Sequence, residues 1–417
     1  MNIINKQTEQ KLIIRSMLDF DHYKLTMGQF VFKSYADVPV KYAFKNRTRN
    51  TRLAEVVDEN ELRYQLDGVR NLRTTDDEIN YLSGLKNNRK PLFGKEYLAF
   101  LKGLQLPNYN LKREDGNFKL EFEGPWAKAI YWETFALSIL NELYYRKLTS
   151  KLGESVIQEG KRRLEEKLEM LEQNPDVKFL EFGTRRRFSR DWQEYVVDRM
   201  KEKIPGQMTG TSNVYLAMKY NLAPKGTMAH ELFMIMSGIM HKNDDEIRAS
   251  HNQVLTEWWN EYGADLSIAL TDTYGSDFFF KDMTAEQAKN WKGMRQDSGS
   301  PDAFANKQIE FYRARGIDPQ QKLFVPSDGL ETKTVIDLQR KFGGKIKTIA
   351  GWGTNLTNDM DLPTLSMVIK AVEANGYGTV KLSDNPAKTM GAPEDVERFM
   401  RIFDYDPTKY QKQECKY

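Results

Sequence analysis

Residues 322–355 read KLFVPSDGLETKTVIDLQRKFGGKIKTIAGWGTN. The stretch begins with a short apolar run, passes through a polar loop, continues with apolar residues at helical spacing, and then repeats the run and the loop. Strand, polar loop and helix in this order are typical of parallel βα units. Similar apolar runs with polar loops after them occur at VKFLEF (177–182) and LSIALTD (266–272). The pattern predicts an α/β fold from about residue 175 to 360.

The expected architecture is an irregular parallel β/α barrel, because loops after parallel strands then gather at one mouth. Upstream, NFKLEFEG (117–124) alternates like a strand with one buried face. Residues 1–128 are therefore expected to form an additional α+β N-terminal domain, and residues 129–384 the barrel-like domain. The last segment, from about 385 to 417, is expected to return to the N-terminal domain.

The composition of the chain argues against several classes of partner and cellular location. The chain has 417 residues, of which 40% are hydrophobic, and its 62 Lys and Arg against 59 Asp and Glu leave a net charge of only +3. This balance argues against nucleic acid or an anionic membrane as the main partner. The single cysteine, Cys415, cannot form a disulfide within one chain and is expected in a frayed tail. Neither a signal peptide nor a long apolar run is visible, so we expect a cytoplasmic location.

Two glycine-containing loops suit a phosphate group. Gly351, Gly353 and Thr354 follow the apolar run KIKTIA, where glycines let backbone N–H groups approach an anion and Thr adds a hydroxyl. The loop Ser327-Asp328-Gly329 repeats this design one unit earlier. Each loop alone could be an ordinary glycine turn. Together they predict a shared anion cradle of the kind that barrels build after their last strands.

Arginines occur in two further loops. Arg185 and the two arginines after it could form a solvated basic cluster, or Arg185 could bind a carboxylate or phosphate through two parallel hydrogen bonds. Arg295 and Asp297, two residues apart, could be a salt bridge in a turn. Alternatively, Arg295 holds an anionic substrate while Asp297 faces developing positive charge or positions a sugar or its metal.

One of the four histidines lies in a predicted mouth loop. His230, with Glu231 beside it in GTMAHE, could be a hydrogen-bonded core histidine or a phosphoryl acceptor oriented by a carboxylate. His22 is expected in a packed N-terminal segment, whereas His241 and His251 flank a polar stretch and are expected at the surface. No histidine spacing typical of zinc sites occurs, and metal ligands stay unassigned.

Seven motifs together resemble the nicotinate phosphoribosyltransferase family, within the type II phosphoribosyltransferases. They occur in the family's order: LDFDHYKLTMGQF (18–30), EFGTRR (181–186), GTSNVYLA (210–217), GTMAHE (226–231), RQDSGSP (295–301), SDGLETK (327–333) and GWGTNL (351–356). The resemblance implies that the chain forms nicotinate mononucleotide and pyrophosphate from nicotinate and phosphoribosyl pyrophosphate in NAD salvage. It also implies Mg²⁺ as cofactor, ATP as co-substrate, and coupling to ATP hydrolysis through a phosphohistidine.

The resemblance also assigns roles to residues. Tyr23 and Phe182 match the aromatic pair that stacks on the pyridine ring, with a homodimer implied if Tyr23 comes from a partner subunit. Arg185 and Arg295 match the residues that meet the pyridine carboxylate and the phosphates, with the division between them left open. His230 matches the phosphorylated histidine and Asp297 the acid near the ribose. The 5′-phosphate and ribose loops match these residues: Ser327, Asp328, Gly329, Gly351, Gly353 and Thr354.

Thr211 and Ser212 bear on the choice of pyridine. Relatives that use nicotinamide have an Asp where Ser212 stands, and a carboxylate there would repel nicotinate. Ser212 therefore favours nicotinate, although it could equally be the N-cap of the helix that follows. A nicotinamide-specific transferase stays open, as does a barrel protein that binds a phosphorylated metabolite without turnover, against which the intact His230 and Asp297 argue.

Overall fold

The structure is a computed structural model, and it describes residues 11–48, 50–150 and 152–412. Cys415 lies outside these residues. Two parallel sheets dominate the second half of the chain, one in the order β11-β10-β9-β8 and the other in the order β12-β6-β7. Their strands are β6 (Phe179–Glu181), β7 (Met208–Thr211), β8 (Ile268–Leu270), β9 (Gly293–Gln296), β10 (Leu323–Pro326), β11 (Lys347–Thr348) and β12 (Ala350–Trp352).

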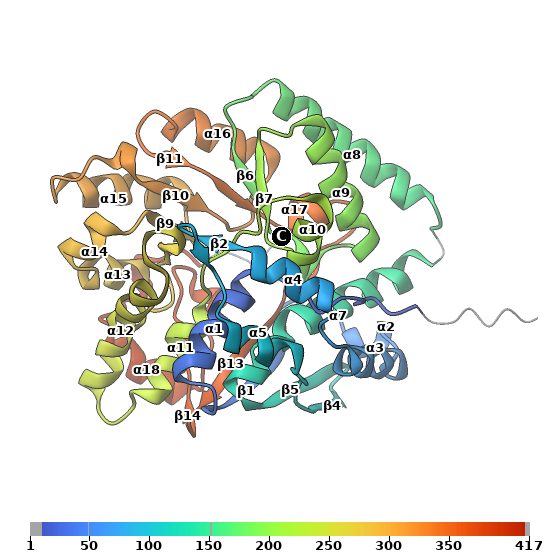
Figure 1. The fold of residues 1–417 in the computed structure, drawn as a ribbon, viewed down its shortest axis with the longest axis horizontal. Helices are drawn as coiled ribbons and strands as arrows, with labels where there is room; N and C mark the ends of the chain where they lie inside the picture. Colours follow the sequence, from blue (N-terminus) through green and yellow to red (C-terminus); the bar gives the residue numbers. More distant parts are fainter. Residues whose placement is uncertain (1–10, 49, 151, 413–417) are drawn as a thin grey trace, which may run out of the picture.

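Helices connect these strands and lie outside them, as Figure 1 shows for α8, α9, α15 and α16. α16 illustrates the local cause, because its apolar residues at helical spacing, from Val335 to Phe342, are the ones that are buried. α15 begins with the N-cap Ser300 and with Pro301 at its first turn. The helices of this half are α8 (Ser155–Glu172), α9 (Arg190–Lys203), α10 (Val214–Tyr220), α11 (His230–Ile239), α12 (Asp244–Tyr262), α13 (Ser276–Asp282), α14 (Ala285–Asn290), α15 (Pro301–Arg313), α16 (Thr332–Phe342), α17 (Thr354–Thr357) and α18 (Pro393–Ile402).

An antiparallel sheet in the order β14-β13-β1-β5-β4 forms the other half of the molecule, at the bottom of Figure 1. The strand expected at 117–124 is β5 and pairs with both β1 and β4. The elements of this half are α1 (Tyr23–Ser34), β1 (Pro39–Asn46), α2 (Leu53–Val56), α3 (Glu59–Asn71), α4 (Asp76–Gly84), β2 (Lys86–Asn87), β3 (Lys90–Pro91), α5 (Lys95–Lys102), β4 (Tyr109–Glu114), β5 (Asn117–Pro125), α6 (Trp126–Ala129), α7 (Trp132–Thr149), β13 (Met367–Ala374) and β14 (Tyr377–Gly378). The fold is thus mixed α/β, with parallel sheets and an N-terminal domain, as the sequence predicts.

The last part of the chain differs from expectation in two places. Residues up to 384 were expected with the barrel, but β13 pairs with β1 from Met367 to Ala374 and extends the antiparallel sheet. Residues after 385 were expected to return to the N-terminal domain, but α18 packs near α12 and Phe403 stacks on Tyr274 with ring centroids 3.8 Å apart. Both differences arise from contacts between distant segments of the chain, which short sequence patterns do not predict.

A continuous apolar core joins the two halves. Five tryptophans are among its largest fully buried side chains: Trp126, Trp132, Trp258, Trp291 and Trp352. Among the described helices, none has the length and apolar character that crossing a membrane requires.

Candidate active site

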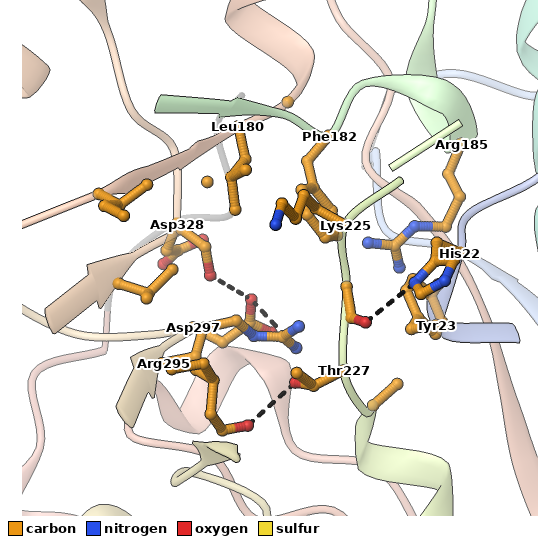
Figure 2. Close-up of a pocket in the computed structure, with 18 of the residues that line it drawn as sticks. His22, Tyr23, Leu180, Phe182, Arg185, Lys225, Thr227, Arg295, Asp297 and Asp328 are labelled. Carbon is orange, nitrogen blue, oxygen red and sulfur yellow. Dashed lines mark hydrogen bonds and ion pairs between the residues drawn. The ribbon is translucent and has the colours of Figure 1, made fainter. Parts of the chain in front are cut away.

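A cavity of about 640 Å³ opens where the loops after β6, β9, β10 and β12 meet the N-terminal segment. Figure 2 shows side chains from these separate elements converging on it, with Phe182 and Arg185 on one side and Arg295, Asp297 and Asp328 on another. Among the described residues, ten basic side chains line the cavity against three carboxylates. In a chain that is almost neutral overall, this local excess favours anionic ligands.

His230 lies at the start of α11, 3% exposed, and lines the cavity. Its Nε2 is 3.0 Å from Asp297 Oδ2 and 3.6 Å from Asp272 Oδ1, while its Nδ1 is 3.0 Å from Thr273 Oγ1. An ionised carboxylate can only accept, so Nε2 carries the proton and the Thr273 hydroxyl donates to Nδ1. Burial, with help from Lys381, lowers the His230 pKa to about 4 in spite of the carboxylates. The imidazole is therefore neutral at physiological pH.

Asp297 follows β9 and connects several of the predicted residues. Burial raises its pKa, but Arg295, His230 and Lys381 outweigh burial and hold it well below its usual range. Ser327 Oγ donates to its Oδ1 at 3.0 Å, and Arg295 Nη2 lies 3.9 Å from the same oxygen. The structure thus places the carboxylate between the histidine and the predicted phosphate loops.

All six residues predicted for these loops line the cavity. Gly351 lies in β12 rather than in the loop expected for it, and a Cβ added to it would lie 3.1 Å from Ser327 Cβ. A Cβ on Gly353 would lie 3.0 Å from the Phe182 carbonyl oxygen. A side chain at either position would have to displace its neighbour, so these glycines allow the segments to pack closely.

Tyr23 and Phe182 both line the cavity of their own chain. They flank Gly226, which has φ +140°, and a Cβ there would lie 3.4 Å from both Tyr23 Cβ and Phe182 Cζ. Arg185 lies beside them, with its guanidinium carbon 5.6 Å from the Tyr23 ring centroid. The arrangement places a cation next to two aromatic side chains, which suits an aromatic carboxylate.

The arginine run after Phe182 divides into different roles. Arg185 Nε is 3.2 Å from Asp21 Oδ2, and the side chain is 34% exposed towards the cavity. Arg187 is 1% exposed and binds both oxygens of Asp19. The interpretation of the run as a solvated cluster is therefore wrong for Arg187, which links the N-terminal segment to the segment after β6.

Thr211 and Ser212 lie behind the cavity wall. Both are fully buried, and neither is among the residues that line the cavity. Ser212 Oγ donates to Asp21 Oδ1 at 2.7 Å, and Thr211 Oγ1 donates to Glu181. The role expected for them in pyridine binding therefore stays a prediction, and the Ser212 hydroxyl is linked to the cavity through Asp21, which binds Arg185. The N-cap of α10 is Asn213 rather than Ser212.

Of the other three histidines, only His22 lines the cavity. His22 is buried, as expected, and its Nδ1–H donates to the Gly226 carbonyl at 3.2 Å. His251 was expected at the surface but is 1% exposed, with its Nδ1 2.6 Å from Asp282 Oδ2. His241 Nδ1 is 3.0 Å from the Ser237 carbonyl oxygen.

Several residues of the site were not predicted. Asp272 and Thr273 contact His230 without lining the cavity, and nothing in TDTYG distinguishes these side chains from ordinary turn residues. Lys370, Lys381 and Lys388 line the cavity and come from the C-terminal region, in which β13 and the residues after 385 were misplaced. Only the pairing of β13 with β1 could have revealed Lys370.

Comparisons with known proteins identify the family of the chain. The model of the nicotinate phosphoribosyltransferase (NAPRTase) family matches residues 177–407, and the model of the NAPRTase N-terminal domain matches residues 18–141. The chain belongs to the nicotinate phosphoribosyltransferase family. A solved nicotinate phosphoribosyltransferase from Vibrio cholerae shares 31% identity and a TM-score of 0.85, covering 95% of this chain and 94% of that one.

A second nicotinate phosphoribosyltransferase structure, from Porphyromonas gingivalis, shares 30% identity and a TM-score of 0.84, covering 94% of this chain and 100% of that one. The resemblance drawn from the seven motifs is confirmed. The chain is a nicotinate phosphoribosyltransferase, an enzyme of NAD salvage.

Proposed function

We propose that the cavity binds nicotinate beside Tyr23 and Phe182, and phosphoribosyl pyrophosphate against the loops after β9, β10 and β12. The observation that carries this proposal is the position of Asp297, which touches His230 at 3.0 Å and the Ser327 hydroxyl at 3.0 Å in one basic cavity. The carboxylate thus lies between a phosphoryl acceptor and a phosphate cradle. That is where the ribose of the substrate would sit.

The reaction needs charge stabilisation more than proton transfer. The pyridine nitrogen donates its lone pair to ribose C1, and the C1–O bond to pyrophosphate breaks, with the electron pair leaving on the pyrophosphate oxygen. The nitrogen carries no proton at neutral pH, so no general base is required. Positive charge develops at C1, where Asp297 can stabilise it, while Arg295 and the basic cavity wall stabilise the leaving group.

Asp272 and Asp297 fit a Mg²⁺ ion. With His230 they offer one ligand atom each within 4.8 Å of one another, and Asp272 Oδ1 is buried without a hydrogen-bond partner among the described residues. Magnesium prefers oxygen ligands, so we assign the two carboxylates to it and leave the imidazole for phosphoryl transfer. When bound, Mg²⁺ would neutralise the pyrophosphate charge.

ATP is the proposed phosphoryl donor to His230. With the proton held on Nε2 by Asp297, the lone pair is on Nδ1. Once its hydrogen bond from the Thr273 hydroxyl is broken, this nitrogen would attack the γ-phosphorus as the bond to ADP breaks, and water would later hydrolyse the phosphohistidine. Phosphorylation would change charge and packing at the mouth and so favour binding of phosphoribosyl pyrophosphate.

Selection of nicotinate is proposed to act through Arg185. The Arg185 guanidinium has two carboxylates within 4.0 Å, Asp21 and Glu133, and Ser212 donates to Asp21. A third carboxylate, at position 212, would compete for Arg185 and repel an anionic pyridine. Tyr23 reaches the cavity of its own chain, so the site proposed here does not require a homodimer.

We further propose that the two parallel sheets form one irregular barrel. A parallel bridge between Thr211 and Pro224 continues from β7, and the Thr227 hydroxyl donates to the Ile268 carbonyl at the start of β8. The backbone N–H of Ile349 donates to Phe324 and that of Ala350 to Lys178, which connects the two sheets on the other side. The N-terminal domain would then include residues 367–378 beside residues 18–128.

Product binding tests the proposed phosphate cradle. Gly351→Val would place a branched side chain against Ser327, and we expect it to weaken binding of nicotinate mononucleotide by at least about tenfold, roughly one lost charge-assisted hydrogen bond. Gly344→Val is the matched control, because a Cβ there meets nothing within 4 Å. Equal affinities of the two variants in titration calorimetry would contradict the assignment.

A further inference from the structure

A buried group of charged side chains lies directly behind the cavity wall. Its centre is Glu133, in the first turn of α7, with a side chain only 2% exposed. Glu133 does not line the cavity and belongs to none of the seven motifs. A carboxylate buried to this extent is costly unless cations compensate it.

Three cations from three different elements converge on this one carboxylate. Lys24 Nζ of α1 lies 2.8 Å from Oε2, and Lys370 Nζ of β13 lies 2.7 Å from Oε1. Arg185 Nη1, from the loop after β6, lies 3.6 Å from the same Oε1. Since Lys370 and Arg185 share one oxygen, their charged ends are held side by side.

Two of these cations face the cavity and one does not. Arg185 and Lys370 line it, whereas Lys24 is fully buried and is also bound by Glu231 at 2.7 Å. Arg185 has a second anionic partner, Asp21. Lys370 has Glu133 as its only carboxylate partner among the described residues.

We propose that Glu133 is a positioning residue, which holds Arg185 and Lys370 together at the cavity wall as a pair of cations for one oxyanion of a substrate. The oxyanion is either the carboxylate of nicotinate or a phosphate of phosphoribosyl pyrophosphate. Two adjacent cations of different elements suit such a group, because each can donate to a different oxygen. The inference rests on the proposed substrate site, since it assigns the wall of that same cavity.

The charges around Lys370 show what Glu133 contributes. Burial lowers the Lys370 pKa, and Arg185 and Lys24 lower it further, while Glu133 is the group that raises it. Glu231, on the far side of Lys24, and Asp21, beside Arg185, are the other nearby carboxylates. Replacing Glu133 by an uncharged residue removes the counter-charge of Lys370 and leaves two cations next to it. Lys370 is then expected to lose its proton at a lower pH than in the parent enzyme.

The test is the pH dependence of Glu133→Gln. We expect its KM for the substrate bound by the pair to rise about tenfold for each pH unit above the lowered Lys370 pKa, while kcat changes little. The parent enzyme should show no such rise between pH 6.5 and 9, a range we choose for the assay. Measuring KM for nicotinate and for phosphoribosyl pyrophosphate separately identifies which oxyanion the pair binds.

A second substitution separates positioning from folding. Arginine does not titrate, so Glu133→Gln combined with Lys370→Arg should lose the pH-dependent rise. Glu142→Gln is the matched control, because Glu142 is a buried glutamate of the same helix that binds Arg146 and the Arg190 backbone away from the cavity. It should leave both KM values unchanged.

Two results would overturn the inference. One is a Glu133→Gln enzyme whose KM values follow the parent's pH profile for both substrates. The other is a pH-dependent rise in KM that persists when Lys370 is replaced by arginine. The activity of the parent enzyme is measured in the same experiment. If the proposed function is wrong, the parent enzyme forms no product. If only this inference is wrong, the parent is active and the pH dependence of KM in Glu133→Gln matches that of the parent.

Discussion

Phosphorylation of His230 by ATP should proceed at nearly the same rate at pH 6 and pH 8. The structure lowers the His230 pKa to about 4 by burial and by the nearby Lys381. At pH 6 such an imidazole is about 99% neutral, whereas a histidine with the ordinary pKa of about 6.5 would be only about one quarter neutral. An ordinary histidine should therefore be phosphorylated about fourfold more slowly at pH 6 than at pH 8.

The assay is a single-turnover reaction with γ-labelled ATP and excess Mg²⁺, quenched in base. A phosphohistidine survives alkali and is lost in acid, so the label should be base-stable and acid-labile. His230→Asn is the control, because asparagine can still donate to Asp297 but has no nucleophilic nitrogen. It should take up no label, yet retain slow ATP-independent transfer with a raised KM for phosphoribosyl pyrophosphate.

Two outcomes would refute this reasoning. A labelling rate that falls about fourfold from pH 8 to pH 6 would mean that His230 titrates as an exposed histidine does. Label on His230→Asn, or full ATP stimulation of that variant, would mean that another group accepts the phosphoryl group. His230 would then be only a hydrogen-bonded core histidine.

Three further substitutions test separate parts of the site. Asp297→Asn should lower kcat by about 10²–10³ in steady-state assays, because it removes charge facing the ribose, and a change confined to KM would contradict this. Lys24→Met leaves two buried glutamates without their shared cation and should cost about 3–5 kcal/mol in urea unfolding. A loss below about 1 kcal/mol would contradict the buried network. Ser212→Asp places a carboxylate against Asp21 and should raise the KM for nicotinate, equivalent to about 1–3 kcal/mol, so an unchanged KM would exclude the route through Arg185.

The parallel half of the fold could be predicted because its signals are local. Each apolar run of three or four residues precedes its own polar loop, as in β10 followed by Ser327 and in β12 followed by Gly353. Parallel strands bring their carboxyl ends to one edge, so the loops had to meet. The prediction that Asp297, His230 and the glycine loops share one site follows from this rule and is consistent with the cavity.

The cations of the cavity wall could not be predicted in this way. Lys370 enters the site because β13 pairs with β1 across more than 300 residues of chain, and no short pattern encodes that pairing. Lys388 reaches Asp328 at 2.6 Å from a segment that we expected in the other domain. The contacts of Ser212 and Arg187 could not be predicted either. Ser212 binds Asp21 and Arg187 binds Asp19, and both aspartates are buried near the N-terminus.

A product assay tests the activity and the choice of pyridine. The purified chain is incubated with phosphoribosyl pyrophosphate, Mg²⁺ and either nicotinate or nicotinamide, with and without ATP, and the mononucleotides are separated by chromatography. We expect nicotinate mononucleotide, formed faster when ATP is present, and little or no product from nicotinamide. Preferential use of nicotinamide would contradict the assigned substrate, and absence of any mononucleotide under all four conditions would contradict the assigned reaction.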